Sequence, residues 1–295
     1  MPKRKATESI YDDRGSQQDG YTNYAFYAEK QYWCGRYVKD RGETFEWFSK
    51  VEPLIPLLTL LIPGSESTVL EIGCGTSQLL TALRQSSQHF GDLIGIDFSP
   101  EAVASATSDA NKSCVSPTPR YLLADARDLS NVASECSIDA VIEKGTFAGM
   151  LSSPNGEEIM AGVLAEVHRV LTDDGILISL SPHDPEDPTE GKNGLVVLEE
   201  MLLPPLLHAA EATGHYYTVD IHSGESFRGI HAYVLRKRLR GRARNRSLGR
   251  YKLAVLIKYG KLIVPLPPES TPDGDPLVKM KDLVAVPYPS GTELS

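Results

Sequence analysis

Two glycines and an acid are the residues whose types and spacing most clearly indicate chemistry in this chain. The short apolar stretch Val69–Ile72 runs directly into Gly73 and Gly75, and Asp97 closes the next apolar stretch 22 positions after Gly75. Glycines in such a turn let the backbone approach a nucleoside, and an acid ending the next strand accepts hydrogen bonds from both ribose hydroxyls. The pattern predicts a nucleoside-binding turn, with a chance GxG in an ordinary tight turn as the plainer alternative.

The turn differs from a dinucleotide-binding turn at its third glycine position, which is Gln78 here. A pyrophosphate needs a bare helix N-terminus close to it, and this sequence does not plainly provide one. S-adenosylmethionine carries a ribose and an adenine without phosphate, together with a sulfonium cation. A cation suits a turn that begins with the acidic Glu71. The turn therefore favours S-adenosylmethionine over a dinucleotide.

Two further apolar stretches end in polar residues. Asp125, followed by Ala126, ends the stretch that begins at Tyr121, and Lys144 follows the stretch Ile138–Ile142. The carboxyl ends of the strands form the ligand crevice of an open parallel sheet, so these residues should lie beside the glycine turn. Asp125 is well placed for the adenine amino group, with the backbone of Ala126 next to it.

Apolar stretches alternate with helical patterns along the chain, which is typical of a doubly wound α/β sheet. The last two stretches have no helix between them, so that pair should be antiparallel and complete a Rossmann-like seven-stranded sheet. The expected strands are Val69–Ile72, Leu93–Ile96, Tyr121–Leu123, Ile138–Ile142, Ile176–Leu180, His215–Ile221 and Ile230–Leu235. The expected helices are Phe45–Ile62, Ser77–Arg84, Pro100–Asn111 behind the N-cap Ser99, Gly156–Leu171 with a stop at Gly175, and Leu195–Thr213.

Taken together, these segments resemble class I S-adenosylmethionine-dependent methyltransferases. More narrowly, the chain resembles the eukaryotic lysine methyltransferase-like branch that includes enzymes modifying translation elongation factor 1-alpha. The resemblance covers roughly residues 32–180, about half of the chain. The segments that carry the narrower resemblance are Tyr32–Tyr37 (YWCGRY), Phe45–Phe48 (FEWF), Leu70–Gly75 (LEIGCG) and Val141–Thr146 (VIEKGT).

The resemblance implies which positions surround the cofactor. An aromatic N-terminal lid should cover it, the glycine turn should approach its amino-acid part, and strand-end residues should meet its nucleoside. The implied positions are Trp33, Tyr37 and Trp47 in the lid, Gly73 at the amino-acid part, Asp97 at the ribose, Phe98, Asp125 and Ala126 at the adenine, and Lys144 at the methionine side.

The segment after Thr146 departs from the lysine-modifying relatives, in which it usually continues Leu-Asp-Ala-Leu. Here it is Phe147–Met150 (FAGM), so an acid that could contact the incoming lysine cation is missing. Two classes of activity stay open: N-methylation of a protein lysine by in-line displacement, and N-, O- or S-methylation of a small molecule of the secondary-metabolite type. A cofactor-binding protein without catalysis is a third interpretation, which the intact glycine turn and acids disfavour.

An oxygen acceptor, or an amine that binds in its protonated form, needs a base. His183 is the candidate because it follows the fifth expected strand on the acceptor side. His222 and His231 fall on the final strand pair and are expected to be structural, whereas His168 is expected to be partly exposed on a helix. The four cysteines form no CxxC pair, so no metal site is predicted.

The net charge and the division of the chain limit which classes of partner we expect. The 295 residues carry a net charge of −9, which disfavours nucleic acid, although Arg236–Lys252 is a basic strip without an acid. We expect a flexible leader over residues 1–20, a methyltransferase domain over 21–236, and the strip with a C-terminal extension over 237–295. The sequence shows neither a secretory signal nor a membrane-spanning stretch, so the expected location is the cytoplasm, with the nucleus as the alternative. The expected partner is a protein substrate or a small-molecule acceptor.

Overall fold

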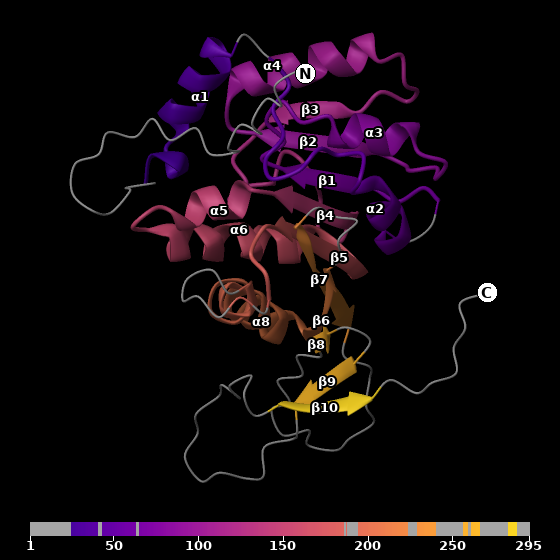
Figure 1. Ribbon diagram of the computed structural model, residues 1–295, viewed down its shortest axis with the longest axis vertical. Helices are drawn as coiled ribbons and strands as arrows, with labels where there is room; N and C mark the ends of the chain where they lie inside the picture. Colours follow the sequence, from indigo (N-terminus) through magenta and orange to yellow (C-terminus); the bar gives the residue numbers. More distant parts are fainter. Residues whose placement is uncertain are drawn as a thin grey trace, which may run out of the picture.

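The computed structural model describes residues 25–40, 43–62, 65–185, 187, 194–223, 229–239, 256–258, 261–265 and 283–287. They form a mixed sheet in the order β10-β9-β8-β6-β7-β5-β4-β1-β2-β3, with helices on both faces (Figure 1). The expected leader, the basic strip beyond residue 239 and the C-terminal extension apart from residues 256–258, 261–265 and 283–287 lie outside the described residues.

Five parallel strands form the half of the sheet on which the predicted site depends. β1 is central between β2 and β4, and β3 and β5 flank this trio. Their near-continuous apolar runs are those of strands covered on both faces, and their carboxyl ends meet at one edge. The strands are β1 (Val69–Ile72), β2 (Leu93–Asp97), β3 (Arg120–Leu123), β4 (Ile138–Lys144) and β5 (Leu171–Ser181).

The last core strands, β6 (His215–Ser223) and β7 (His231–Leu239), are antiparallel to each other, and β7 is antiparallel to β5. This confirms the expected antiparallel end of a seven-stranded sheet. β7 extends to Leu239, which pairs with His215 of β6, and the buried Lys237 ammonium donates to the carbonyls of His168 (2.9 Å) and Leu171 (2.8 Å). On the other side of β6 the sheet is extended by β8 (Leu256–Lys258), β9 (Lys261–Pro265) and β10 (Leu283–Pro287).

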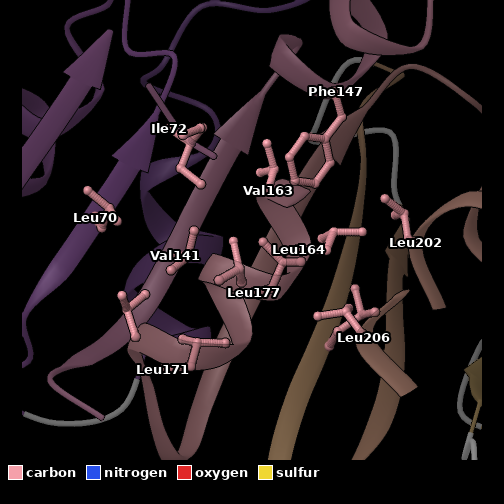
Figure 2. Close-up of a cluster of buried hydrophobic side chains, with 14 of the residues drawn as sticks. Leu70, Ile72, Val141, Phe147, Val163, Leu164, Leu171, Leu177, Leu202 and Leu206 are labelled. Carbon is pink, nitrogen blue, oxygen red and sulfur yellow. The ribbon is translucent and has the colours of Figure 1, made fainter. Parts of the chain in front are cut away.

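Alternate side chains of the strands pack against two helix layers. Leu70, Ile72 and Val141 pack in the layer that contains α6 (Gly156–Val170) and α8 (Leu203–Thr213), as Figure 2 shows. Val69 packs in the opposite layer with α2 (Ile55–Leu61), α3 (Leu79–Gln85) and α4 (Pro100–Lys112). A short helix, α7 (Gly194–Val197), and a π-helical turn, η2 (Leu198–Leu202), lead into α8. Among the described residues, no helix is long and apolar enough to cross a membrane.

Three short elements cover the carboxyl edge of the parallel strands. α5 (Thr146–Leu151) follows directly after β4, and η1 (Ala25–Ala28) lies against α5. α1 (Lys30–Lys39) packs against α4. The N-terminal aromatic segment is thereby brought to the edge where the predicted site lies (Figure 1).

Two helix expectations are wrong in part. Residues 43–50 contain bends instead of a helix, Phe48 has a φ of 61°, and the helix begins only at Ile55, after Pro53. Gly175 is not a helix stop, because α6 ends at Val170 and Gly175 lies inside β5. The N-cap prediction is confirmed, since the Ser99 hydroxyl accepts the Ala102 N–H at 3.3 Å.

Candidate functional site

The glycine turn follows β1 and comes close to two other segments. Gly73 and Gly75 have φ of 64° and 51°, a region in which a side chain is strained. A Cβ on Gly73 would collide with the side chain of Thr146, whose hydroxyl donates to the carbonyl of Ile72 at 3.0 Å. A Cβ on Gly75 would lie 2.5 Å from the Tyr37 hydroxyl oxygen. The turn therefore needs glycine both for its conformation and for close packing.

Asp97, at the end of β2, is bound to the glycine turn. Its Oδ2 accepts the Gly75 N–H at 3.0 Å and its Oδ1 accepts the Ser99 N–H at 2.8 Å. Burial raises the pKa of the Asp97 carboxyl, and these two N–H groups act against that shift. The acid is thus fixed beside the turn, as the spacing of the sequence predicts for a ribose-binding residue.

Glu71 is a buried carboxyl that lines the same cavity as the glycine turn. Its Oε2 atom has no hydrogen-bond partner among the described residues. Burial raises the pKa of Glu71 to about 8, although the nearby Lys144 lowers it. A buried acceptor without a donor is costly, so this oxygen suits a donor supplied by a ligand.

Lys144, at the end of β4, forms a buried ion pair that the sequence does not indicate. Its ammonium lies 2.8 Å from Oε2 of Glu46 and 3.1 Å from the carbonyl of Trp47. The Lys144 and Glu46 side chains are only 3% and 15% exposed. Lys144 lines the cavity as the partner of a residue from the N-terminal segment, and its contact with the methionine side of a cofactor stays a prediction.

The aromatic lid consists of Tyr27, Trp33, Tyr37, Phe45 and Trp47, all of which line the cavity. The Trp47 ring centroid lies 5.7 Å from that of Tyr27, 5.9 Å from Trp33 and 5.6 Å from Phe45. The indole N–H of Trp33 donates to the carbonyl of Tyr27 at 2.7 Å. The lid is therefore a packed cluster, and Trp47 is at its centre.

The structure brings together all of the predicted cofactor residues except Asp125 and Ala126. Asp125 instead lines an adjacent cavity, which shares Ala28, Phe98 and Met150 with the first. The Asp125 carboxylate lies 2.6 Å from the Arg127 guanidinium, which keeps the pKa of Asp125 below its usual value. Ala126 lines neither cavity and packs in the core. The residues of the glycine-turn cavity that were predicted are Trp33, Tyr37, Trp47, Glu71, Gly73, Gly75, Asp97, Phe98 and Lys144.

His183 lines neither cavity. Its carbonyl accepts the Tyr233 hydroxyl at 2.7 Å, and its N–H donates to the Ser181 hydroxyl at 3.2 Å. These contacts fix the backbone after β5 and involve only the carbonyl and N–H of His183. The role of the His183 side chain as a base stays a prediction.

His168 is buried, which corrects the expectation of partial exposure. Its ring nitrogens lie 3.0 Å from the Tyr217 hydroxyl and 2.7 Å from the Thr213 hydroxyl. Burial lowers the pKa of His168 to about 4, helped by the Lys237 ammonium. Residues of α8 and β6 cover this side of α6, so a helical pattern alone could not show the burial.

Two acidic residues were missed by the sequence analysis. Glu143 is buried beneath α5, where it accepts the Phe147 N–H at 3.1 Å and a short hydrogen bond from the Ser179 hydroxyl; burial raises its pKa to about 7. Glu46 holds Lys144. Both residues lie inside segments that carry the narrower resemblance (FEWF and VIEKGT). This position in the sequence was the only feature that could have pointed to them.

The chain belongs to the methyltransferase domain family, because the model of that family matches residues 63–224, more than half of the chain. Together with the sheet order, this match confirms the predicted class of protein.

Two curated relatives and one solved structure illustrate the similarity. The chain is 36% identical over 156 residues to citrate synthase-lysine N-methyltransferase CSKMT, mitochondrial, from Pongo abelii, covering 48% of this chain and 64% of that protein. It is 29% identical over 160 residues to methyltransferase srdJ from Neurospora crassa, covering 52% of this chain and 66% of that protein. The alignments thus span just under two thirds of both relatives. A putative S-adenosyl-L-methionine-dependent methyltransferase from Methanococcus maripaludis is 11% identical with a TM-score of 0.47, covering 77% of this chain and 100% of that one.

Proposed function

We propose that this protein transfers the methyl group of S-adenosylmethionine to the side-chain amine of a lysine in a protein substrate. One observation carries the cofactor assignment: the unpartnered Oε2 of Glu71 and the ammonium of Lys144 line the same cavity. The amino-acid end of S-adenosylmethionine is a zwitterion. The Glu71 carboxylate suits its amino group, and the Lys144 ammonium suits its carboxylate.

The rest of the cofactor has matching partners at the other strand ends. Asp97 would hold the ribose hydroxyls, as an acid at the end of the second strand does in nucleoside-binding sheets. The adenine would occupy the adjacent cavity, between Phe98 and Asp125.

 With the cofactor in these two cavities, its methionine part would lie at the glycine turn and its adenine beside Met150 of α5, which lines both cavities.

When bound, S-adenosylmethionine supplies an electrophilic methyl group on a sulfonium. An acceptor that attacks the methyl carbon in line releases the sulfur as a neutral thioether. The chain's own residues then have to position the acceptor and exclude water. The aromatic lid serves both purposes, because its rings cover the glycine turn and line the cavity. An aromatic wall also attracts a cationic amine through the ring faces, and such an amine must lose a proton to a base or to water before its lone pair can attack the methyl carbon.

The lysine acceptor is supported by the resemblance in the FEWF and VIEKGT segments and by the name of the Pongo abelii relative, a citrate synthase-lysine N-methyltransferase. In the described structure, the residues of the first segment contact those of the second: Glu46 pairs with Lys144, and the Trp47 ring packs on Gly145. Two of the segments that carry the narrower resemblance thus build one wall of the cavity.

Methylation of a small molecule is the second candidate, and one observation favours it. The residue that replaces the acid of the lysine-modifying relatives is Ala148, which is exposed on α5. η1 lies against α5, and the carbonyl of Tyr27 is 3.2 Å from the Cβ position of Gly149. An acceptor side that η1 and α5 close together suits a small molecule that the lid can enclose.

The experiment that separates the two candidates uses S-adenosylmethionine with a labelled methyl group. The purified protein is incubated with a host-cell extract, the products are separated by size, and the variant D97A serves as the control without cofactor binding. We expect label in a discrete protein band and, by mass spectrometry, on a lysine of that protein. Label confined to the small-molecule fraction would overturn the lysine proposal in favour of the second candidate.

We also propose a cytoplasmic location, with the nucleus as the alternative. The Pongo abelii relative is named as a mitochondrial protein. Fractionation of host cells into cytosol, nuclei and mitochondria tests the proposal, and recovery of the protein with mitochondria would overturn it.

A further inference from the structure

Glu46 joins three segments that are far apart in the sequence. Its carboxylate accepts the Ser77 hydroxyl at 2.9 Å and the Gln78 N–H at 2.8 Å, both just before α3. The same carboxylate lies 2.8 Å from the ammonium of Lys144 at the end of β4. Glu46 itself belongs to the aromatic lid segment, next to Trp47. One side chain therefore connects the lid, the helix after the glycine turn and the fourth strand.

The consequence for Lys144 is a fixed position. A lysine side chain has several rotatable bonds, and its ammonium has three N–H donors. Two acceptors, the Glu46 carboxylate and the Trp47 carbonyl, hold this ammonium from the lid side. The side chain is 3% exposed yet lines the cavity, so an ammonium held in this way can present its remaining donor to a ligand.

The buried charge of Lys144 also depends on Glu46. A buried ammonium without a counter-charge is costly, and removing one member of a buried pair leaves the other uncompensated. Glu71 is a second carboxyl near Lys144, but burial raises the pKa of Glu71 to about 8, so the counter-charge of Lys144 at neutral pH is the Glu46 carboxylate, 2.8 Å away.

We propose that Glu46 is a positioning residue that fixes the Lys144 ammonium for the carboxylate of the cofactor's amino-acid end. The inference rests on the proposed use of S-adenosylmethionine and adds how its amino-acid end is selected. Glu46 does not touch the cofactor in this proposal; it acts through Lys144. The affinity for a ligand with the amino-acid end should therefore depend on Glu46, and the affinity for the nucleoside part alone should not.

Two probes and the full-length protein test this inference by calorimetry. S-adenosylhomocysteine carries the amino-acid end, whereas methylthioadenosine lacks it and keeps the nucleoside and the sulfur. E46Q removes the charge and keeps a side chain of the same shape, so it should weaken S-adenosylhomocysteine by about tenfold, the scale of one lost charge-assisted hydrogen bond. The affinity for methylthioadenosine should stay within about twofold of wild type on the same scale.

Matched variants show whether the effect passes through Lys144. K144Q should weaken S-adenosylhomocysteine similarly, and E46Q combined with K144Q should be no worse than K144Q alone, because coupled residues are not additive. E43Q is the control, since the Glu43 side chain is exposed and its only described contact with the turn region is through its carbonyl, which accepts the Thr76 hydroxyl at 3.0 Å. E43Q should bind both probes like wild type.

Each other outcome overturns the inference. Equal weakening of both probes by E46Q would mean that Glu46 only supports the fold or the lid, and unchanged affinity for both would mean that it has no such role. Additive losses in the double variant would mean that Glu46 does not act through Lys144. If wild-type protein bound neither probe, the proposed function itself would fail, and this result differs from a failure of the Glu46 proposal alone.

Discussion

The Asp97 carboxylate and the Gly75 backbone N–H are joined by a 3.0 Å hydrogen bond between the ends of β2 and β1. The bond links the acid to the turn that it is expected to serve, although the two residues lie 22 positions apart. Loss of the acid would therefore affect both the shape of the turn and the contact with a ribose.

Replacing Asp97 by Ala should abolish tight cofactor binding. Two N–H groups, those of Gly75 and Ser99, would lose their acceptor, so the free energy of unfolding should fall by about 1–3 kcal/mol. The affinity for S-adenosylhomocysteine should fall by at least about tenfold, since a charge-assisted hydrogen bond is lost. Calorimetry and urea unfolding measure the two effects, and an unchanged affinity would refute the ribose assignment.

Cofactor binding should release a proton from Glu71. Burial raises the pKa of Glu71 to about 8, so at neutral pH the carboxyl of the ligand-free protein is mostly protonated. A cationic amino group beside its unpartnered oxygen favours the ionised form, and the affinity should therefore rise as the pH approaches 8. Calorimetry in two buffers of different ionisation enthalpy detects the released proton. E71Q should release fewer protons than wild type, and equal release would contradict the assignment.

His168 should make the protein less stable in acid. Its pKa is lowered from 6.5 to about 4, so the folded state resists a proton that the unfolded chain accepts. This stability is fully present above pH 6.5 and is lost as the pH falls from 6.5 to 4. H168Q removes the titrating group, so the difference between wild type and H168Q in urea unfolding should shrink as the pH falls. A constant difference over this range would show that His168 does not titrate in this way.

Glu143 should change the stability of the protein with pH in the opposite direction to His168. Its pKa is raised from 4.5 to about 7, so the folded state holds a proton that the unfolded chain releases. The stabilisation is fully present below pH 4.5 and is lost as the pH rises through 7. E143Q should therefore lose less stability than wild type between these limits. Unfolding curves with parallel pH dependence for the two proteins would be the contradicting result.

Opening the lid should speed the exchange of cofactor. Trp33 packs on Tyr37 with ring centroids 5.9 Å apart and donates to the Tyr27 carbonyl. W33A removes both contacts, whereas W33F keeps a ring and loses only the hydrogen bond. The dissociation rate of S-adenosylhomocysteine in stopped-flow experiments should rise in the order wild type, W33F, W33A. Three equal rates would mean that the lid does not cover the cofactor.

The sequence predicted the parts of the site that depend on strand order. Gly73 directly follows a strand, Asp97 and Lys144 each end one, and the ends of parallel strands meet at one edge. The Glu46–Lys144 pair could not be predicted, because 98 residues separate its members and no periodic pattern connects them. The sequence identified the aromatic residues of the lid but not the bends that position them. The apolar pattern from Phe45 onward indicates a helix, and nothing in it shows that the chain bends at Phe48.

All described residues that line the glycine-turn cavity fall between Tyr27 and Met150. The strands and helices after that point support the sheet without contributing to this wall. Their influence on the cavity is indirect: the Ser179 hydroxyl of β5 bonds Glu143, and Glu143 in turn accepts the Phe147 N–H of α5. A substitution after Met150 should therefore reach the cavity only through the packing of the sheet.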